Sequence, residues 1–106
     1  MALGDLEQLV MLALMHLEGE GFGAAVQREI ETRAARTVSL GAVYTSLSRL
    51  EEKRFIASHI GEPLAQRGGR RRRVYCVLPA GRVAIAQAFR AIRELSRGLR
   101  SQLEAG

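Results

Sequence analysis

Apolar residues recur at spacings of three and four along most of this chain, which is the period of an amphipathic α-helix. Three such segments cover residues 3–17, residues 23 or 24 to 36, and residues 40–53. Ser39 stands directly before the third segment, where its hydroxyl is suited to accept a backbone hydrogen bond as an N-cap. The pattern therefore predicts three helices joined by short turns.

The third predicted helix has two contrasting faces. Its apolar stripe, which we expect in the core, consists of Leu40, Val43, Leu47 and Leu50. The opposite face carries hydroxyl side chains and an arginine, which suit contacts to phosphates and base edges, although such a face can also be merely solvated. Gly41 and Ala42 are small enough to let another molecule approach the backbone. The candidate contact residues here are Ser39, Tyr44, Thr45, Ser48 and Arg49.

After this helix the pattern changes to the alternation of β-strands. Residues 55–62 and 71–78 are expected to form the two strands of a hairpin, separated by a loop with Pro and Gly. The hairpin is rich in arginine: Arg67, Arg70, Arg71, Arg72 and Arg73. A short helix followed by a basic hairpin is the layout of a winged helix-turn-helix, whose helix enters the DNA major groove. The arginines could clamp phosphates or probe the minor groove, and both uses stay open.

Basic residues are concentrated in the same region. Residues 39–82 contain nine Lys or Arg and three acidic residues, a net charge of +6, whereas residues 1–38 have a net charge of −3. A locally basic surface beside a hydroxyl-rich helix is typical of nucleic-acid-binding proteins. The expected partner is double-stranded DNA.

A last helix is predicted from Pro79, which suits a first helical turn, to about residue 104. A helix of about 25 residues spans roughly 37 Å, longer than the small domain that it leaves. Its apolar stripe therefore needs a partner, for which a second copy of the chain is the simplest choice; the alternative is a helix folded back on its own domain. The expected dimerisation residues are Ile85, Phe89, Ile92, Leu95, Leu99 and Leu103.

Composition limits the remaining possibilities. With 106 residues, 47% of them hydrophobic and 25% charged, the chain is typical of one globular domain with an appended element. The apolar run at residues 9–15 is too short to span a bilayer, and Asp5 and Glu7 occupy the flank where a signal peptide would be positively charged. A cytoplasmic protein without membrane contact is expected.

Candidate catalytic and metal-binding residues are few and isolated. Cys76 is the only cysteine. It is two residues from both Val74 and Leu78, the spacing of one strand face, so we expect it to be a buried hydrophobe in a strand. His16 and His59 stand apart from any recognisable nucleophile, base or ligand cluster. The sequence therefore indicates neither an enzyme nor a metal or cofactor site.

Several short segments carry a resemblance to a known family. They are Leu3-Gly4-Asp5-Leu6-Glu7, Phe22-Gly23, residues 39–53 in full, Gly68-Gly69-Arg70, and Tyr75 followed by Leu78-Pro79-Ala80-Gly81-Arg82. Together they resemble the PadR family of bacterial transcriptional regulators, in its short-tailed form. The resemblance implies a homodimeric repressor whose third helix enters the major groove, whose wing touches the backbone or minor groove, and whose C-terminal helix dimerises.

Three departures from the family pattern bear on structure. Arg54 replaces the glycine that often closes the third helix in a left-handed conformation, and Leu78 replaces the usual threonine cap of the last helix. The chain has no Trp. Some relatives bind planar drugs between tryptophans, and that mode of effector binding is not expected here; the sequence names no other effector.

These observations favour a mainly α-helical fold with a small β-hairpin. A winged helix-turn-helix domain would occupy residues 1–78, and a long dimerisation helix residues 79–106. The leading hypothesis is a homodimeric DNA-binding transcriptional regulator, a repressor of a two-fold-related operator. The alternative is a winged-helix module that binds an acidic protein partner.

Overall fold

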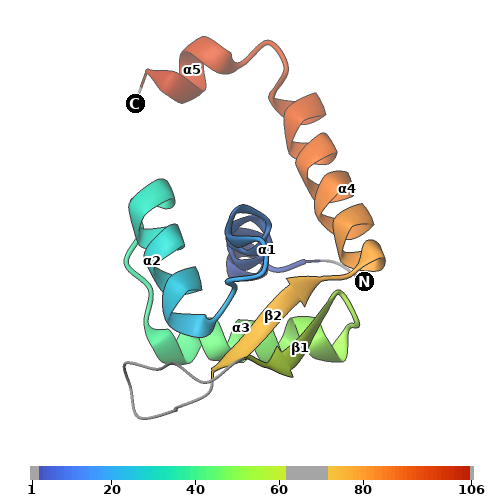
Figure 1. Cartoon of the computed structure of the whole chain (residues 1–106). Helices are drawn as coiled ribbons and strands as arrows, with labels where there is room; N and C mark the ends of the chain where they lie inside the picture. Colours follow the sequence, from blue (N-terminus) through green and yellow to red (C-terminus); the bar gives the residue numbers. More distant parts are fainter. Residues whose placement is uncertain (1–2, 62–71, 106) are drawn as a thin grey trace.

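Three helices are followed by a two-stranded hairpin and two further helices in the part of the chain that the computed structural model describes, residues 3–61 and 72–105 (Figure 1). This architecture confirms the predicted fold class, a mainly α-helical chain with a small hairpin. In chain order the elements are α1 (Asp5–Leu17), α2 (Gly23–Ala34), α3 (Leu40–Glu52), β1 (Ile56–Ile60), β2 (Arg73–Val77), α4 (Pro79–Ser96) and α5 (Arg100–Glu104).

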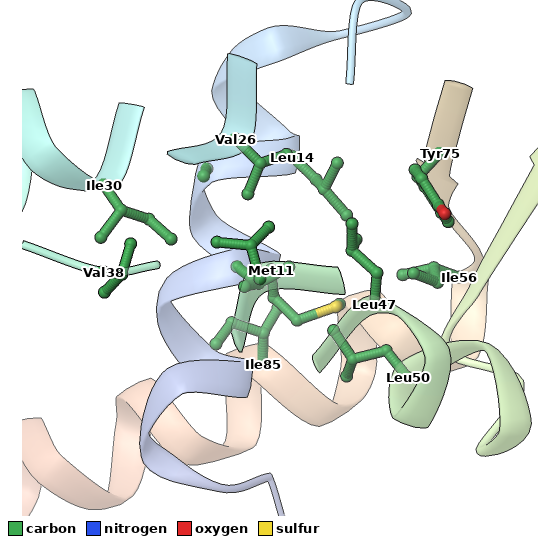
Figure 2. Packing of buried hydrophobic residues seen from close by; sticks show 13 residues of the cluster. Met11, Leu14, Val26, Ile30, Val38, Leu47, Leu50, Ile56, Tyr75 and Ile85 are labelled. Atoms are coloured by element: carbon green, nitrogen blue, oxygen red, sulfur yellow. The ribbon is translucent and has the colours of Figure 1, made fainter. Parts of the chain in front are cut away.

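Helix α1 is the centre of the core. It packs against α2, α3, β2 and the start of α4, and its buried side chains include Met11 and Leu14 (Figure 2). Val43, Leu47 and Leu50 of α3 are buried as expected. Leu40 is not, and the prediction for it was wrong: at the first position of the helix it stays exposed. Val38, which precedes the helix, packs in the core instead.

Glu7 joins the beginning of α1 to the end of α3. Its Oε1 accepts a hydrogen bond of 2.6 Å from the backbone N–H of Gly4, which caps α1, and both carboxylate oxygens accept from Lys53 Nζ, at 2.8 and 2.9 Å. Burial alone would raise the pKa of Glu7, but the hydrogen bonds from Lys53 and Gly4 and the nearby positive charge outweigh it. The pKa therefore lies below its ordinary value of 4.5.

The hairpin is antiparallel and docks on the core through one face. Ser58 pairs with Tyr75, and Tyr75 N–H donates to the carbonyl of Gly21 in the α1–α2 turn at 2.9 Å. A Cβ at Gly21 would lie 2.7 Å from Tyr75 O, so this approach requires glycine. Tyr75 is consequently buried and Cys76 points to the other face, where it is exposed. The prediction of a buried Cys76 was wrong because the strand docks with the opposite face.

The two junctions that flank the hairpin show how the chain accommodates Arg54 and Leu78. Arg54 closes α3 with a left-handed φ of 63°, while Arg54 N–H and Phe55 N–H donate to the carbonyls of Glu51 and Leu50, as in a Schellman motif. Leu78 is the N-cap of α4 and makes no side-chain capping bond. Arg54 thus takes a conformation that glycine adopts at lower cost, and α4 begins without a side-chain cap.

The last helix is shorter than predicted. It ends at Ser96, and Gly98 takes a left-handed φ of 85° before the short α5 begins. The prediction of a single helix over residues 79–104 was therefore wrong. Glycine adopts the left-handed conformation at little cost, and the chain turns there. In Figure 1, α4 projects away from the body of the protein, and α5 turns back at its end. None of the helices in the described ranges is long and apolar enough to cross a membrane.

The apolar stripe of α4 divides into a buried and an exposed part. Ile85 is only 5% exposed and belongs to the core of its own chain, contrary to its expected place in a dimer interface. Phe89, Ile92 and Leu95 are 58%, 59% and 84% exposed, and Leu99 and Leu103 are exposed as well. The difference arises because α4 contacts the core only near its start.

Candidate nucleic-acid interface

The exposed face of α3 brings together the predicted contact residues that lie within this helix. Gly41, Tyr44, Thr45, Ser48 and Arg49 are all exposed, and their spacings of three and four place them on one side of the helix. The buried side holds Val43, Leu47 and Leu50 against α1 and the hairpin. The helix is thus anchored by its apolar stripe, with its hydroxyls and its arginine turned outward.

At the N-terminal end of this face, polar groups are held by the helix itself. Ser39 Oγ accepts a hydrogen bond of 3.0 Å from Ala42 N–H, which confirms the predicted cap. Thr45 Oγ1 donates to the carbonyl of Gly41 at 3.0 Å, so that its lone pairs stay available as acceptors. A Cβ added at Gly41 would meet no heavy atom within 4 Å. Packing within the chain therefore does not require glycine at this exposed helical position.

Tyr44 lies where α3 meets the start of α2. A Cβ at Gly23 would lie 2.5 Å from Tyr44 Oη, so the absence of a side chain at Gly23 makes room for the tyrosine ring. The sequence contained the pair Phe22-Gly23, but spacing alone did not indicate that it supports a residue more than twenty positions away. Tyr44 is held on the flank of the exposed face by the first turn of α2.

Two arginines at the base of the hairpin have partners within the chain. The guanidinium of Arg72 lies 4.2 Å from the centre of the Phe22 ring, a cation–π contact. Arg73 Nη1 donates to Ser58 Oγ at 3.0 Å, and Ser58 Oγ donates to Glu51 Oε2 at 2.5 Å. Sequence reasoning assigned no role to Ser58 or Phe22, because nothing in the local pattern connects either of them to an arginine.

Glu51 also affects the buried tyrosine of β2. Burial raises the pKa of Tyr75, and the negative charge of Glu51 raises it further.

The predicted contact residues Arg67, Arg70 and Arg71 lie outside the described residues. Within the described residues, the candidate interface consists of the outer face of α3 and the base of the hairpin.

Three helices with an exposed third helix, followed by an antiparallel hairpin, define a winged helix-turn-helix protein. Residues 11–87 match the PadR-like family of transcriptional regulators. The chain is also 38% identical over 92 residues to the transcriptional regulator Rv3488 of Mycobacterium tuberculosis, a match that covers 83% of this chain and 79% of that protein. The chain belongs to the PadR-like family of transcriptional regulators.

Solved structures agree on the fold. A PadR-like transcription factor from Bacteroides fragilis superposes with a TM-score of 0.73 at 23% identity, covering 90% of this chain and 86% of that chain. A PadR-like transcriptional regulator from Bacillus cereus has a TM-score of 0.74 at 17% identity, covering 92% of this chain and 90% of that chain. The winged-helix fold is therefore shared with experimentally determined structures over nearly the full length.

Proposed function

We propose that this PadR-family regulator is a homodimer that binds a two-fold-related operator through α3 and represses the gene next to it. The observation that carries the proposal is the exposed face of α3, where hydroxyl groups and an arginine line one side of a helix. Ser48 and Arg49 lie in the middle of the helix and towards its end, and we assign to them the contacts to base edges. Tyr44 and Thr45 are proposed phosphate or base contacts on the same face.

The proposed partner of the exposed stripe on α4 and α5 is a second copy of the chain. Phe89, Ile92 and Leu95 form an apolar surface that extends beyond the part of α4 covered by the core. A groove of about 390 Å³ adjoins this surface and includes Ile92 in its lining; its other walls are Leu3, Gln8 of α1, and three alanines and Gln87 of α4. An apolar helix face of this kind is stabilised when a two-fold-related copy covers it.

The hairpin supplies positive charge beside α3. Its arginines other than Arg73, whose guanidinium donates to Ser58, are proposed to lie near DNA phosphates on either side of the major groove, a use that does not depend on base sequence. Arg67, Arg70 and Arg71 enter this proposal from the sequence alone. In this division of roles, α3 reads the operator and the hairpin strengthens binding.

The test begins with DNA selected by the purified protein from a random pool. Arg49→Ala should then weaken binding to the selected duplex by roughly 1–3 kcal/mol, with little change on random DNA. Arg90→Ala is the control of equal charge, since Arg90 is exposed on α4, away from the apolar stripe. Equal losses for the two variants would contradict base reading by α3. Failure to select any DNA would contradict the proposal and favour an acidic protein partner.

A further inference from the structure

A chain of two hydrogen bonds connects the hairpin to the end of α3. Ser58 of β1 accepts from Arg73 of β2 at 3.0 Å and donates to Glu51 of α3 at 2.5 Å. The hydroxyl of Ser58 therefore uses its single hydrogen on the carboxylate and a lone pair on the guanidinium. One serine joins a cation and an anion that lie on different elements.

The register of the hairpin explains why Arg73 reaches Ser58. Arg73 pairs with Ile60, and Ser58 lies two residues further along on the same face of the two-stranded sheet. Diagonal neighbours on one face are within reach of a long side chain such as arginine. Ser58 itself pairs with Tyr75, which faces the core. The guanidinium of Arg73 is thus directed along the sheet towards α3.

Glu51 is the informative member of this chain. An acidic side chain on a surface that binds DNA repels phosphate, so its presence lowers affinity unless it has another effect. Here its carboxylate accepts the only hydrogen bond that the Ser58 hydroxyl can donate, and Glu51 lies two residues after Arg49 on the same helix. Rotation of the hairpin relative to α3 would stretch the bond between Glu51 and Ser58.

We propose that Glu51, Ser58 and Arg73 are positioning residues that fix the angle of the wing relative to α3, and that Arg73 acts through Ser58 rather than by touching phosphate. This inference rests on the proposed binding of DNA by α3 and the hairpin. The contact of Arg72 with Phe22 supports it independently, because it ties the beginning of β2 to the α1–α2 turn. The hairpin base is thereby held on two sides.

The decisive test is a substitution for which the positioning role and simple electrostatics predict opposite changes in DNA affinity. Glu51→Gln removes a negative charge, so simple electrostatics predicts tighter DNA binding. Replacing the carboxylate with a neutral amide oxygen, which accepts from Ser58 more weakly, loosens the positioning bond and predicts weaker binding to the selected duplex. We expect a loss of about 2- to 10-fold, the range that one net hydrogen bond is worth. The matched control is Glu52→Gln, an exposed neighbour on the same helix, which should bind all DNA slightly more tightly.

Three further variants test the path through Ser58. Ser58→Ala, which removes the hydroxyl and both of its bonds, should lose at least as much selected-duplex affinity as Glu51→Gln. Ser58→Thr, which keeps the hydroxyl on a strand-compatible residue, should bind like the wild type. Both Ser58 variants should have the thermal melting profile of the wild type. Arg73→Ala should weaken selected-duplex binding without changing the slope of log affinity against log salt, whereas loss of a phosphate contact flattens that slope by about 0.9.

Arg49→Ala, measured on the same duplexes, separates the two levels of the argument. If Arg49→Ala loses preference for the selected duplex but Glu51→Gln binds as tightly as Glu52→Gln, the positioning role is overturned and the proposed function stands. A flattened salt slope for Arg73→Ala would also overturn it. If Arg49→Ala causes no loss either, DNA reading by α3 and the inference built on it are both wrong.

Discussion

The buried carboxylate of Glu7 offers a quantitative test of how α3 is held in place. Glu7→Gln keeps the length of the side chain and an oxygen for the Gly4 N–H, but it removes the negative charge that Lys53 contacts. The Lys53 side chain is 19% exposed, so water can compensate in part. Hydrogen bonds to charged groups are worth about 1.5–3 kcal/mol, and we expect a loss of unfolding free energy near 2 kcal/mol, within that range.

Urea unfolding at neutral pH, followed by circular dichroism, should reveal this loss. Thermal unfolding should show a fall in Tm of roughly 8–16 °C. Protein concentrations must be matched, because association would make the apparent stability depend on concentration. Glu29→Gln is the control: its ion pair with Arg33 is at the surface, at 2.6 Å, and should contribute less than about 0.5 kcal/mol.

Acid provides a second signature of the same pair. Because the pKa of Glu7 is lower in the folded protein than its ordinary value of 4.5, the stabilisation is complete above that value and is lost as pH falls through the folded pKa. The difference in stability between the wild type and Glu7→Gln should therefore be constant near neutrality and shrink in acid below 4.5. A difference that is absent at neutral pH, or that does not change in acid, would refute the reasoning.

Three more variants test other parts of the structure. Gly41→Ala should stabilise the protein by about 0.5–1 kcal/mol, since the Cβ meets nothing, yet weaken operator binding if DNA approaches the backbone there; unchanged affinity in a filter-binding assay would contradict that approach. Arg54→Gly should raise the urea midpoint, with a gain of about 0.5–1 kcal/mol, because glycine removes the left-handed strain; a lower midpoint would mean that strain is not the dominant effect. Phe89→Glu combined with Ile92→Glu should give folded monomers in sedimentation and abolish tight DNA binding, and persistence of dimers would exclude this surface as the interface.

Periodicity predicted the helical core well because burial imposes the helical period directly on the sequence. The three N-terminal helices begin and end within about two residues of their expected bounds, and the exposed face of α3 carries the predicted residues. The face of β2 was not predictable in the same way. Val74 and Cys76 alternate with Tyr75 and Val77, so both faces are apolar, and the bond between Tyr75 and Gly21 decides which one is buried.

Charge patterning pointed to a basic region but treated its arginines as equivalent. A side chain's partner depends on register and on elements distant in sequence, as the contacts of Arg72 with Phe22 and of Arg73 with Ser58 illustrate. The break at Gly98 escaped prediction for a related reason. Glycine tolerates both a helical and a left-handed conformation, so the apolar spacing continues across a point where the helix stops.

The division of the α4 stripe links folding to the proposed dimer. Ile85 and Phe89 are one helical turn apart on the same stripe, yet the first is buried in its own chain and the second is exposed. Periodicity could not separate them, because a core and an interface demand the same residue types at the same spacing. A substitution at Ile85 should therefore unfold the winged helix, whereas one at Phe89 should act on association alone. Since the two residues share one rigid helix, a second copy that covers Phe89 would also stabilise the helix that Ile85 anchors, and assembly and folding would reinforce each other.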